Sequence, residues 1–233
     1  MIVSINQPSY LPWLGYFERI GKSDLHIVLD HVQFEKNSFT NRNKVRTKEG
    51  WTWLTVPLMT KGRFGELAIN SIEIVPNDPW PRKHWATLKM SYAKAPFFRD
   101  YAPAYEELYS RSWGGFMPMV RAFLAQHLRD LGVETPLLYS SEMGVGGSKS
   151  ELVLNLCRAA GADSYLSGAM GRDYLDEPAF TTSNIAVHYQ DYAHPTYTQS
   201  QPGFVPFMGI VDLIFNHGPA SRDILLNRTP VQS

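Results

Sequence analysis

The fold is decided by residues 2–46, IVSINQPSYLPWLGYFERIGKSDLHIVLDHVQFEKNSFTNRNKVR, because two short apolar runs flank a helical pattern there. Residues 2–5 form the first run, which stops at a loop that contains a proline, as is typical of a buried strand. Pro12 presets the backbone for a helix that runs to Gly21, and residues 25–29 form the second run. We therefore predict a strand, a helix and a strand in that order.

A strand–helix–strand unit implies two parallel strands that are joined by a right-handed crossover. The loops after the two strands, residues 6–10 and 30–34, are then expected side by side at one edge of the sheet. In open parallel sheets, ligands bind at the carboxyl ends of the strands. The sequence therefore predicts the functional site at this edge.

Polar side chains are concentrated in these two loops and in the residues that follow. A histidine beside a carboxylate can serve as a general base, and a neutral amide can orient a substrate, so Gln7, Asp30 and His31 are candidate catalytic residues. The other candidates can bind phosphate, amide or carboxylate groups. They are Tyr10, Gln33, Lys36, Asn37, Ser38, Asn41, Arg42, Lys44 and Arg46. The competing interpretation is a solvated basic loop, with His26 packed in the sheet and His31 in solvent.

The composition sets limits on the class of protein. The length of 233 residues suits one α/β domain, and the 22 basic residues balance the 22 acidic ones, so bulk binding of nucleic acid is possible but not favoured. A single cysteine, Cys157, excludes a disulfide framework and a cysteine zinc site. No basic leader and no run of roughly 18 apolar residues is present, so we expect a cytoplasmic protein without a membrane span.

The middle of the chain predicts a helical block. Residues 51–58 and 68–75 have the pattern of strands, and residues 80–92, 97–109 and 116–131 have helical spacing. Because no strand separates the three helices, we interpret residues 80–131 as a helical insertion or a lid within a single domain of residues 1–233.

A second strand–helix–strand unit follows at residues 136–139, 149–160 and 164–167, with a further strand at 185–189 and a helix at 210–216. The loop SGAMGRDYLDE after the third of these segments combines glycines, which let a backbone approach a ligand, with Arg172 and Tyr174. Tyr197 and Gln199 form another polar pair, equally consistent with a loop that satisfies its own backbone. These four residues complete the candidate substrate-binding set, and the predicted fold is α/β with a mostly parallel open sheet.

Several familiar chemistries are unsupported. Residues 144–150, GVGGSKS, lack the spacing of a phosphate-binding P-loop, and no G-x-G-x-x-G follows the first strand. The histidines are scattered, and no G-x-S-x-G elbow is present. We therefore expect no cofactor and no metal site.

Five segments resemble the WbqC-like protein family: QPSYLPWLGYFERI, LDHVQFEKNSFTNRNKV, SYLSGAMGRDYLDE, PTYTQ and FVPFMGIVDLIFNHG. In this order and spacing they span nearly the whole chain. The chain departs from the family pattern at Met208 and Gly209, where a more polar pair is expected. A remoter likeness links the first two strand units to the adenylate-forming nucleotidyltransferases, which implies a Rossmann-like topology. Residues 13–16, WLGY, keep the glycine of their His-x-Gly-His signature but replace both histidines, so that chemistry is not carried over.

The resemblance implies a transferase in bacterial surface-polysaccharide biosynthesis that moves an amino acid such as glycine to an activated acceptor. The expected substrate is nucleotide-linked or otherwise carries phosphate, which Lys36, Arg42, Lys44 and Arg46 would hold. Two alternatives stay open at this point. One is amine or amino-acid transfer to a modified base in DNA, and the other is a noncatalytic module that binds nucleotide sugars.

Overall fold

The computed structural model describes residues 1–36, 38–63, 65 and 67–227. Its central feature is a five-stranded sheet in the order β5-β2-β1-β6-β7, and all four neighbouring pairs are parallel. The strands are β1 (Ile2–Asn6), β2 (Leu25–Val28), β5 (Leu137–Tyr139), β6 (Ser164–Ser167) and β7 (Ala186–Tyr189). The predicted α/β fold with an open parallel sheet is confirmed.

The predicted pairing of the first two strands is also confirmed. Strand β1 pairs with β2 in parallel, with Val3 opposite Leu25 and Asn6 opposite Val28. The backbone N–H of Leu29 then donates a hydrogen bond of 2.7 Å to the carbonyl of Asn6. The loops that follow β1 and β2 therefore start side by side at the same edge.

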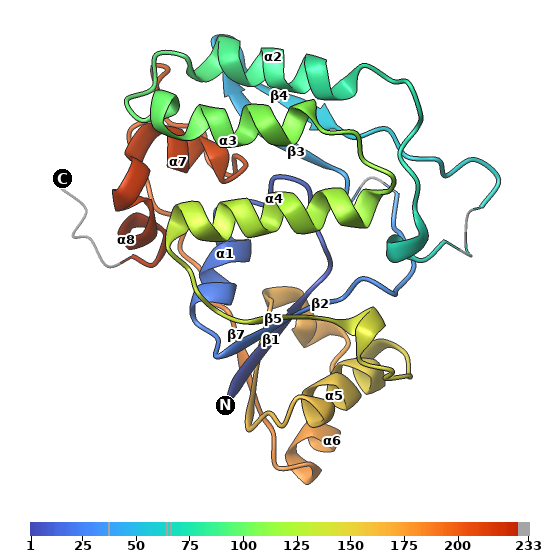
Figure 1. Cartoon of the computed structure of the whole chain (residues 1–233). Coiled ribbons are helices and arrows are strands. Elements are labelled where there is room, and N and C mark those ends of the chain that lie inside the picture. The colour runs from blue at the N-terminus through green and yellow to red at the C-terminus, as the bar shows by residue number, and fades with distance from the viewer. Residues whose placement is uncertain (37, 64, 66, 228–233) are drawn as a thin grey trace.

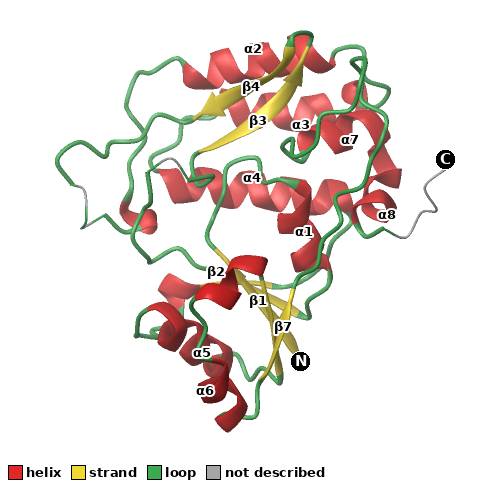
Figure 2. Cartoon of the chain, turned by 180° about the vertical axis from the view of Figure 1, so that it is seen from behind, coloured by secondary structure: helices red, strands yellow, loops and turns green. Residues whose placement is uncertain are grey.

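Helices cover both faces of the sheet because successive side chains of a strand point to opposite faces. Val3, Ile5 and Ile27 share one apolar core with α5 (Lys149–Ala159) and α6 (Glu177–Thr182). Val28 belongs to the other core, which contains α1 (Leu14–Gly21). Figure 2 shows α5 and α6 on one side of the sheet and α1 on the other.

A second, larger layer lies beyond α1 (Figure 1). It contains the antiparallel hairpin of β3 (Arg42–Thr47) and β4 (Gly50–Thr55). Its helices are α2 (Trp80–Tyr92), α3 (Phe98–Ser110), α4 (Phe116–Leu131), α7 (Val211–His217) and α8 (Ser221–Leu225). Short 3-10 helices occur at Ile69–Ser71, Ser140–Glu142, Ala169–Asp173 and Gly218–Ala220. Helices α2 and α4 have the predicted bounds, and α3 and α7 are shifted by one residue.

Two predicted segments were wrong. The polar loop that we expected up to Arg46 becomes strand β3 at Arg42, because Asn43 and Val45 alternate inward while Arg42 and Lys44 point outward. The strand predicted at residues 68–75 is a 3-10 turn at Ile69–Ser71. There the Ser71 hydroxyl and backbone N–H both donate to the carbonyl of Ala68, which closes a turn instead of a ladder.

Met208 and Gly209, which depart from the family pattern, lie where their loop contacts the hairpin of β3 and β4. Met208 is fully buried, and the N–H of Gly209 donates to the carbonyl of Lys44. A Cβ at position 209 would lie 2.9 Å from the carbonyl oxygen of Leu11. Residue 209 must therefore be glycine where the loop after β1 passes the hairpin.

Candidate functional site

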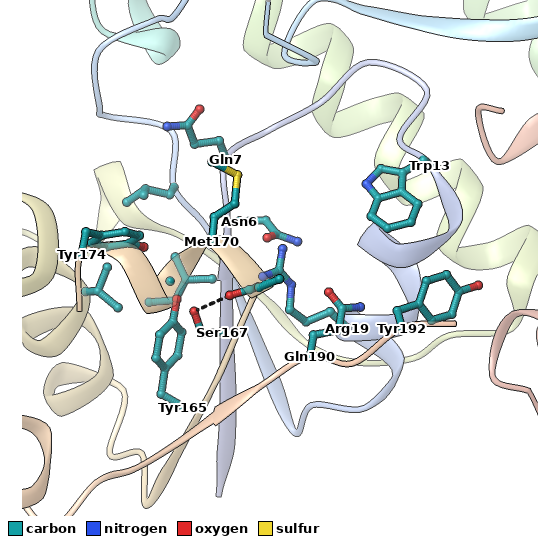
Figure 3. Close-up of a pocket in the computed structure, with 16 residues that line it drawn as sticks. Asn6, Gln7, Trp13, Arg19, Tyr165, Ser167, Met170, Tyr174, Gln190 and Tyr192 are labelled. Carbon is teal, nitrogen blue, oxygen red and sulfur yellow. Dashed lines mark hydrogen bonds between the residues drawn. The ribbon is translucent and has the colours of Figure 1, made fainter. Parts of the chain in front are cut away.

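A pocket of about 550 Å³ opens at the carboxyl ends of β1, β6 and β7 (Figure 3). Asn6 and Gln7 reach it from β1, and Ser167 and the glycine loop reach it from β6. Arg19 enters it from the last turn of α1. Because three strand ends and a helix meet there, side chains far apart in the sequence line one cavity.

The topology explains why the pocket forms at this place. From β1 the chain continues through β2 to β5 on one side of the sheet, whereas β6 and β7 lie on the other side. The helices α1 and α5 that serve the two halves cover opposite faces. The connections therefore diverge between β1 and β6, and such a switch point is where open α/β sheets bind their ligands.

Arg19 is the main charged group of this pocket. Within the described residues its guanidinium has no hydrogen-bond acceptor and no ion-pair partner. Burial lowers the pKa of Arg19 from its usual value, although a guanidinium in a protein stays charged at neutral pH. The buried carboxylate of Glu18 acts on Arg19 but is itself paired with Lys22, so it compensates the guanidinium charge only in part, and the pocket favours an anionic ligand.

Gly168 makes room for that guanidinium. A Cβ at position 168 would lie 2.3 Å from Nη1 of Arg19, which is far inside contact distance. The neighbouring Gly171 is equally constrained, because a Cβ there would lie 2.0 Å from Oγ of Ser167. The backbone of the SGAMG loop therefore lies close to the Arg19 guanidinium at Gly168 and close to Ser167, the last residue of β6, at Gly171.

In the part of the chain that the structure describes, three residues with a buried polar atom that lacks a protein partner line the same pocket. Nδ2 of Asn6, Nε of Arg19 and the hydroxyl of Tyr192 have no hydrogen-bond partner among the described residues, and all three residues line the cavity. Buried polar groups in folded proteins are nearly always paired, so each of these donors needs an explanation. A ligand with several acceptor oxygens would satisfy them together.

The opposite wall of the pocket is aromatic. Trp13 lies edge-to-face with Tyr192, with 5.7 Å between ring centroids, and with Phe207 at 5.8 Å. The indole of Trp13 covers Gly15, where a Cβ would lie 2.2 Å from the ring. Gln190 stands between the two walls and donates to the carbonyl of Gly15 and to the carboxylate of Glu18. The pocket thus offers a cation on one side and ring surface on the other.

The candidate catalytic residues Asp30 and His31 lie at the ends of β2 and β5. Nδ1 of His31 and Oγ of Ser140 share a hydrogen bond of 2.6 Å, and the same hydroxyl lies 3.1 Å from Oδ1 of Asp30. Asp30 is buried, and it also accepts from the backbone N–H and the hydroxyl of Ser141. The Asp30, His31 and Ser140 group lies outside the pocket between β1 and β6.

Other predicted site residues are engaged in structural contacts. Tyr10 is fully buried, and its hydroxyl bonds Nδ1 of His84 at 2.9 Å and the hydroxyl of Tyr109. Tyr197 and Gln199 donate to the buried carboxylate of Asp212 at 2.8 Å each. Their side chains tie loops to the second layer and do not line the pocket.

The predicted cationic cluster is divided between the surface and the interior. Lys36, Asn41 and Arg42 line a separate open hollow of about 270 Å³. Lys44 lies over the rings of Trp51 and Trp53 on the hairpin. Arg46 is buried and donates to backbone carbonyls, including those of Pro202 and Gly203.

The remaining predicted residues lie in local contacts. Gln33 bonds the backbone of Phe34 and Leu67, and Ser38 bonds Glu35 and Thr40. Arg172 lies 4.0 Å above the ring of Tyr189. Asn37 lies outside the described residues. Of all the predicted site residues, Gln7 and Tyr174 are those that line the pocket between β1 and β6.

The comparisons with known proteins place the chain in a family. The WbqC-like protein family matches residues 7–224, so the chain belongs to that family. It is 34% identical over 225 residues to Rv1507c of Mycobacterium tuberculosis, described as an uncharacterized protein, and the match covers 96% of both chains. No solved structure matches it. In the described part of the chain, no helix is long and apolar enough to cross a lipid bilayer.

The close contact at Gly168 gives a testable prediction. We expect Gly168→Ala to push the Arg19 guanidinium from its position and to weaken binding of pyrophosphate at least as much as the loss of one hydrogen bond to a charged group, about 1.5 to 3 kcal/mol. Isothermal titration calorimetry measures the change. Gly146→Ala is the matched control, because a Cβ at position 146 meets nothing within 4 Å. Equal affinity of the two variants would refute this role of Gly168.

Proposed function

We propose that the protein is a transferase that acts on a phosphate-bearing, nucleotide-linked small substrate bound between β1 and β6. The observation that carries the proposal is the Arg19 guanidinium, which enters the pocket without an acceptor from the described residues and packs against Gly168. A planar guanidinium pairs well with phosphate oxygens. The aromatic wall around Trp13 suits the ring of a nucleotide.

The second substrate is an amino acid such as glycine, as the family resemblance implies for bacterial surface-polysaccharide biosynthesis. In this reaction the amine nitrogen forms a bond to the activated carbon, and the bond from that carbon to the phosphate oxygen breaks. The phosphate leaves with the electron pair, and the nitrogen gives up a proton. Arg19 stabilises the negative charge that develops on the leaving group. The proton passes to solvent, because His31, which Ser140 and Asp30 hold, does not line this pocket.

The assay offers the purified protein pairs of one nucleotide sugar or pyrophosphorylated nucleotide and one amino acid. Product is followed by mass spectrometry, and released phosphate, pyrophosphate or nucleotide is followed in parallel. Turnover with any pair supports a transferase. Tight binding without product from every pair would instead favour a noncatalytic module that binds nucleotide sugars.

A substitution at Gln7 tests substrate positioning alone, because its amide lines the pocket and carries no charge. We expect Gln7→Ala to lower kcat/KM by about tenfold to a hundredfold for the pair that is turned over, since small misplacements of reacting groups are costly. The fold should be unchanged because Gln7 is exposed. Gln201→Ala in the partly exposed segment before Gly203 is the control, and an equal loss in both variants would count against a positioning role for Gln7.

A further inference from the structure

The hairpin of β3 and β4 presents an outward face in which basic and aromatic side chains alternate. Its inner face, with Val45 and Leu54, is buried in the core. The outer face carries Lys44 opposite Trp53 and Arg46 opposite Trp51 in the antiparallel register. Figure 2 shows the hairpin lying over α2 and α3, on the far side of α1 from the sheet. This face is separate from the pocket that the proposed function uses.

The rings and cations of this face lie in direct contact. Nζ of Lys44 lies 4.3 Å from the ring centroid of Trp51 and 5.4 Å from that of Trp53. The guanidinium of Arg42 lies 4.5 Å from the ring of Trp53, and Phe39 extends the row at 5.8 Å from Trp53. Phe39 and Trp51 are 52% and 44% exposed, which leaves ring surface open to a ligand.

The charge of the hairpin is one-sided although the chain as a whole is neutral. Residues 42–55 contain four basic residues and one acidic residue. Arg46 is covered by Pro202 and Gly203, but within the described residues the ammonium of Lys44 has no ion-pair partner. The face is therefore complementary to an anionic chain that also carries rings.

The hairpin is joined to the loop that leads into the pocket. The Ser9 hydroxyl donates to the carbonyl of Phe39 at 2.7 Å, and Ser9 is two residues from Gln7 at the pocket. The backbone N–H of Tyr10 donates to the carbonyl of Thr40 at 2.8 Å. The start of the aromatic row therefore lies next to the loop after β1.

We propose that this face, built from Phe39, Arg42, Lys44, Trp51 and Trp53, binds single-stranded nucleic acid. Exposed rings give bases a surface for stacking, and the cations between them lie where a phosphate backbone would run. Lys44 contributes both to phosphate binding and to base stacking, because it neutralises phosphate and holds the Trp51 and Trp53 rings in place. An uncharged sugar would use the rings but gain nothing from the cations.

The test is fluorescence anisotropy with a labelled oligothymidylate of about 12 nucleotides, a length typical of single-strand sites. Trp51→Ala should weaken binding by about tenfold or more, the loss of one stacked base. Lys44→Ala should weaken binding and reduce the slope of log K against log salt by about 0.7. Lys89→Ala is the matched control, since Lys89 also lies over an indole, that of Trp85, on another surface.

The outcomes separate this proposal from the proposed function. Wild-type binding that is lost in Trp51→Ala and Lys44→Ala but kept in Lys89→Ala and Arg19→Met supports the hairpin face. No binding at low salt, or equal affinity of the wild type and both hairpin variants, overturns it. Binding of heparin without binding of the oligonucleotide also overturns it, because the face would then recognise charge on a polysaccharide. Pyrophosphate titrations of the hairpin variants test the pocket independently, and they should match the wild type.

Discussion

Arg19→Met is expected to weaken binding of a phosphate-bearing ligand by about 2 to 5 kcal/mol, the cost of removing one partner from a desolvated pair of charges. Methionine preserves most of the length and apolar volume of the side chain, so the cost falls on the lost charge and hydrogen bonds. The measurement is calorimetric titration with pyrophosphate and with a nucleoside diphosphate. Both ligands should be affected, because both present phosphate oxygens to the pocket.

The control for this substitution is Arg129→Met. Arg129 is exposed on α4, where its guanidinium bonds Gln126. It carries the same charge as Arg19 but does not line the pocket. If Arg19→Met binds pyrophosphate as tightly as Arg129→Met does, Arg19 does not hold the ligand.

Asp212→Ala is expected to destabilise the fold by about 3 to 5 kcal/mol, because three buried donors lose their acceptor and an unsatisfied buried donor costs about 1 to 3 kcal/mol. Its carboxylate accepts hydrogen bonds of 2.8 Å from Tyr92, Tyr197 and Gln199. These donors lie on α2 and on the segment before α7, so one residue joins segments far apart in the chain. Urea unfolding measures the loss. Asp223→Ala, at an exposed position in α8, should change stability by less than about 0.5 kcal/mol.

The same residue predicts a dependence of stability on pH. Burial raises the pKa of Asp212, and the hydrogen bonds from Tyr92, Tyr197 and Gln199 oppose that rise in part. A raised pKa in the folded state means that this group's contribution is fully present below the unfolded pKa of about 3.9 and is lost as pH rises through the folded value. Asp212→Asn should therefore flatten the stability profile above pH 4. An unchanged profile would show that Asp212 does not titrate differently in the folded protein.

The sheet was predictable from the sequence because its signals are local. The apolar runs 2–5 and 25–29 and the helix between them imply a parallel pair, and the structure confirms it. The hairpin was harder, since Arg42, Lys44 and Arg46 look like a polar loop when only their charge is considered. Their alternation with Asn43 and Val45, which are buried, was the signal for a strand.

The pocket could be predicted only in part. The sequence placed Gln7 and Tyr174 in loops at strand ends, but Arg19, in the last turn of α1, was not among the predicted site residues. Its role depends on the position of Gly168, about 150 residues later, beside the helix. The order of the strands fixes that contact, and a single sequence does not encode strand order by any local pattern. The rule that ligands bind at the switch point would have found Asn6 and Ser167 once β1 and β6 were known as neighbours.

The most direct test of the account is a crystal structure of the protein soaked with pyrophosphate. We expect phosphate oxygens within hydrogen-bond distance of the Arg19 guanidinium, at the carboxyl ends of β1 and β6. Pyrophosphate bound instead in the hollow lined by Lys36, Asn41 and Arg42, with none beside Arg19, would contradict it.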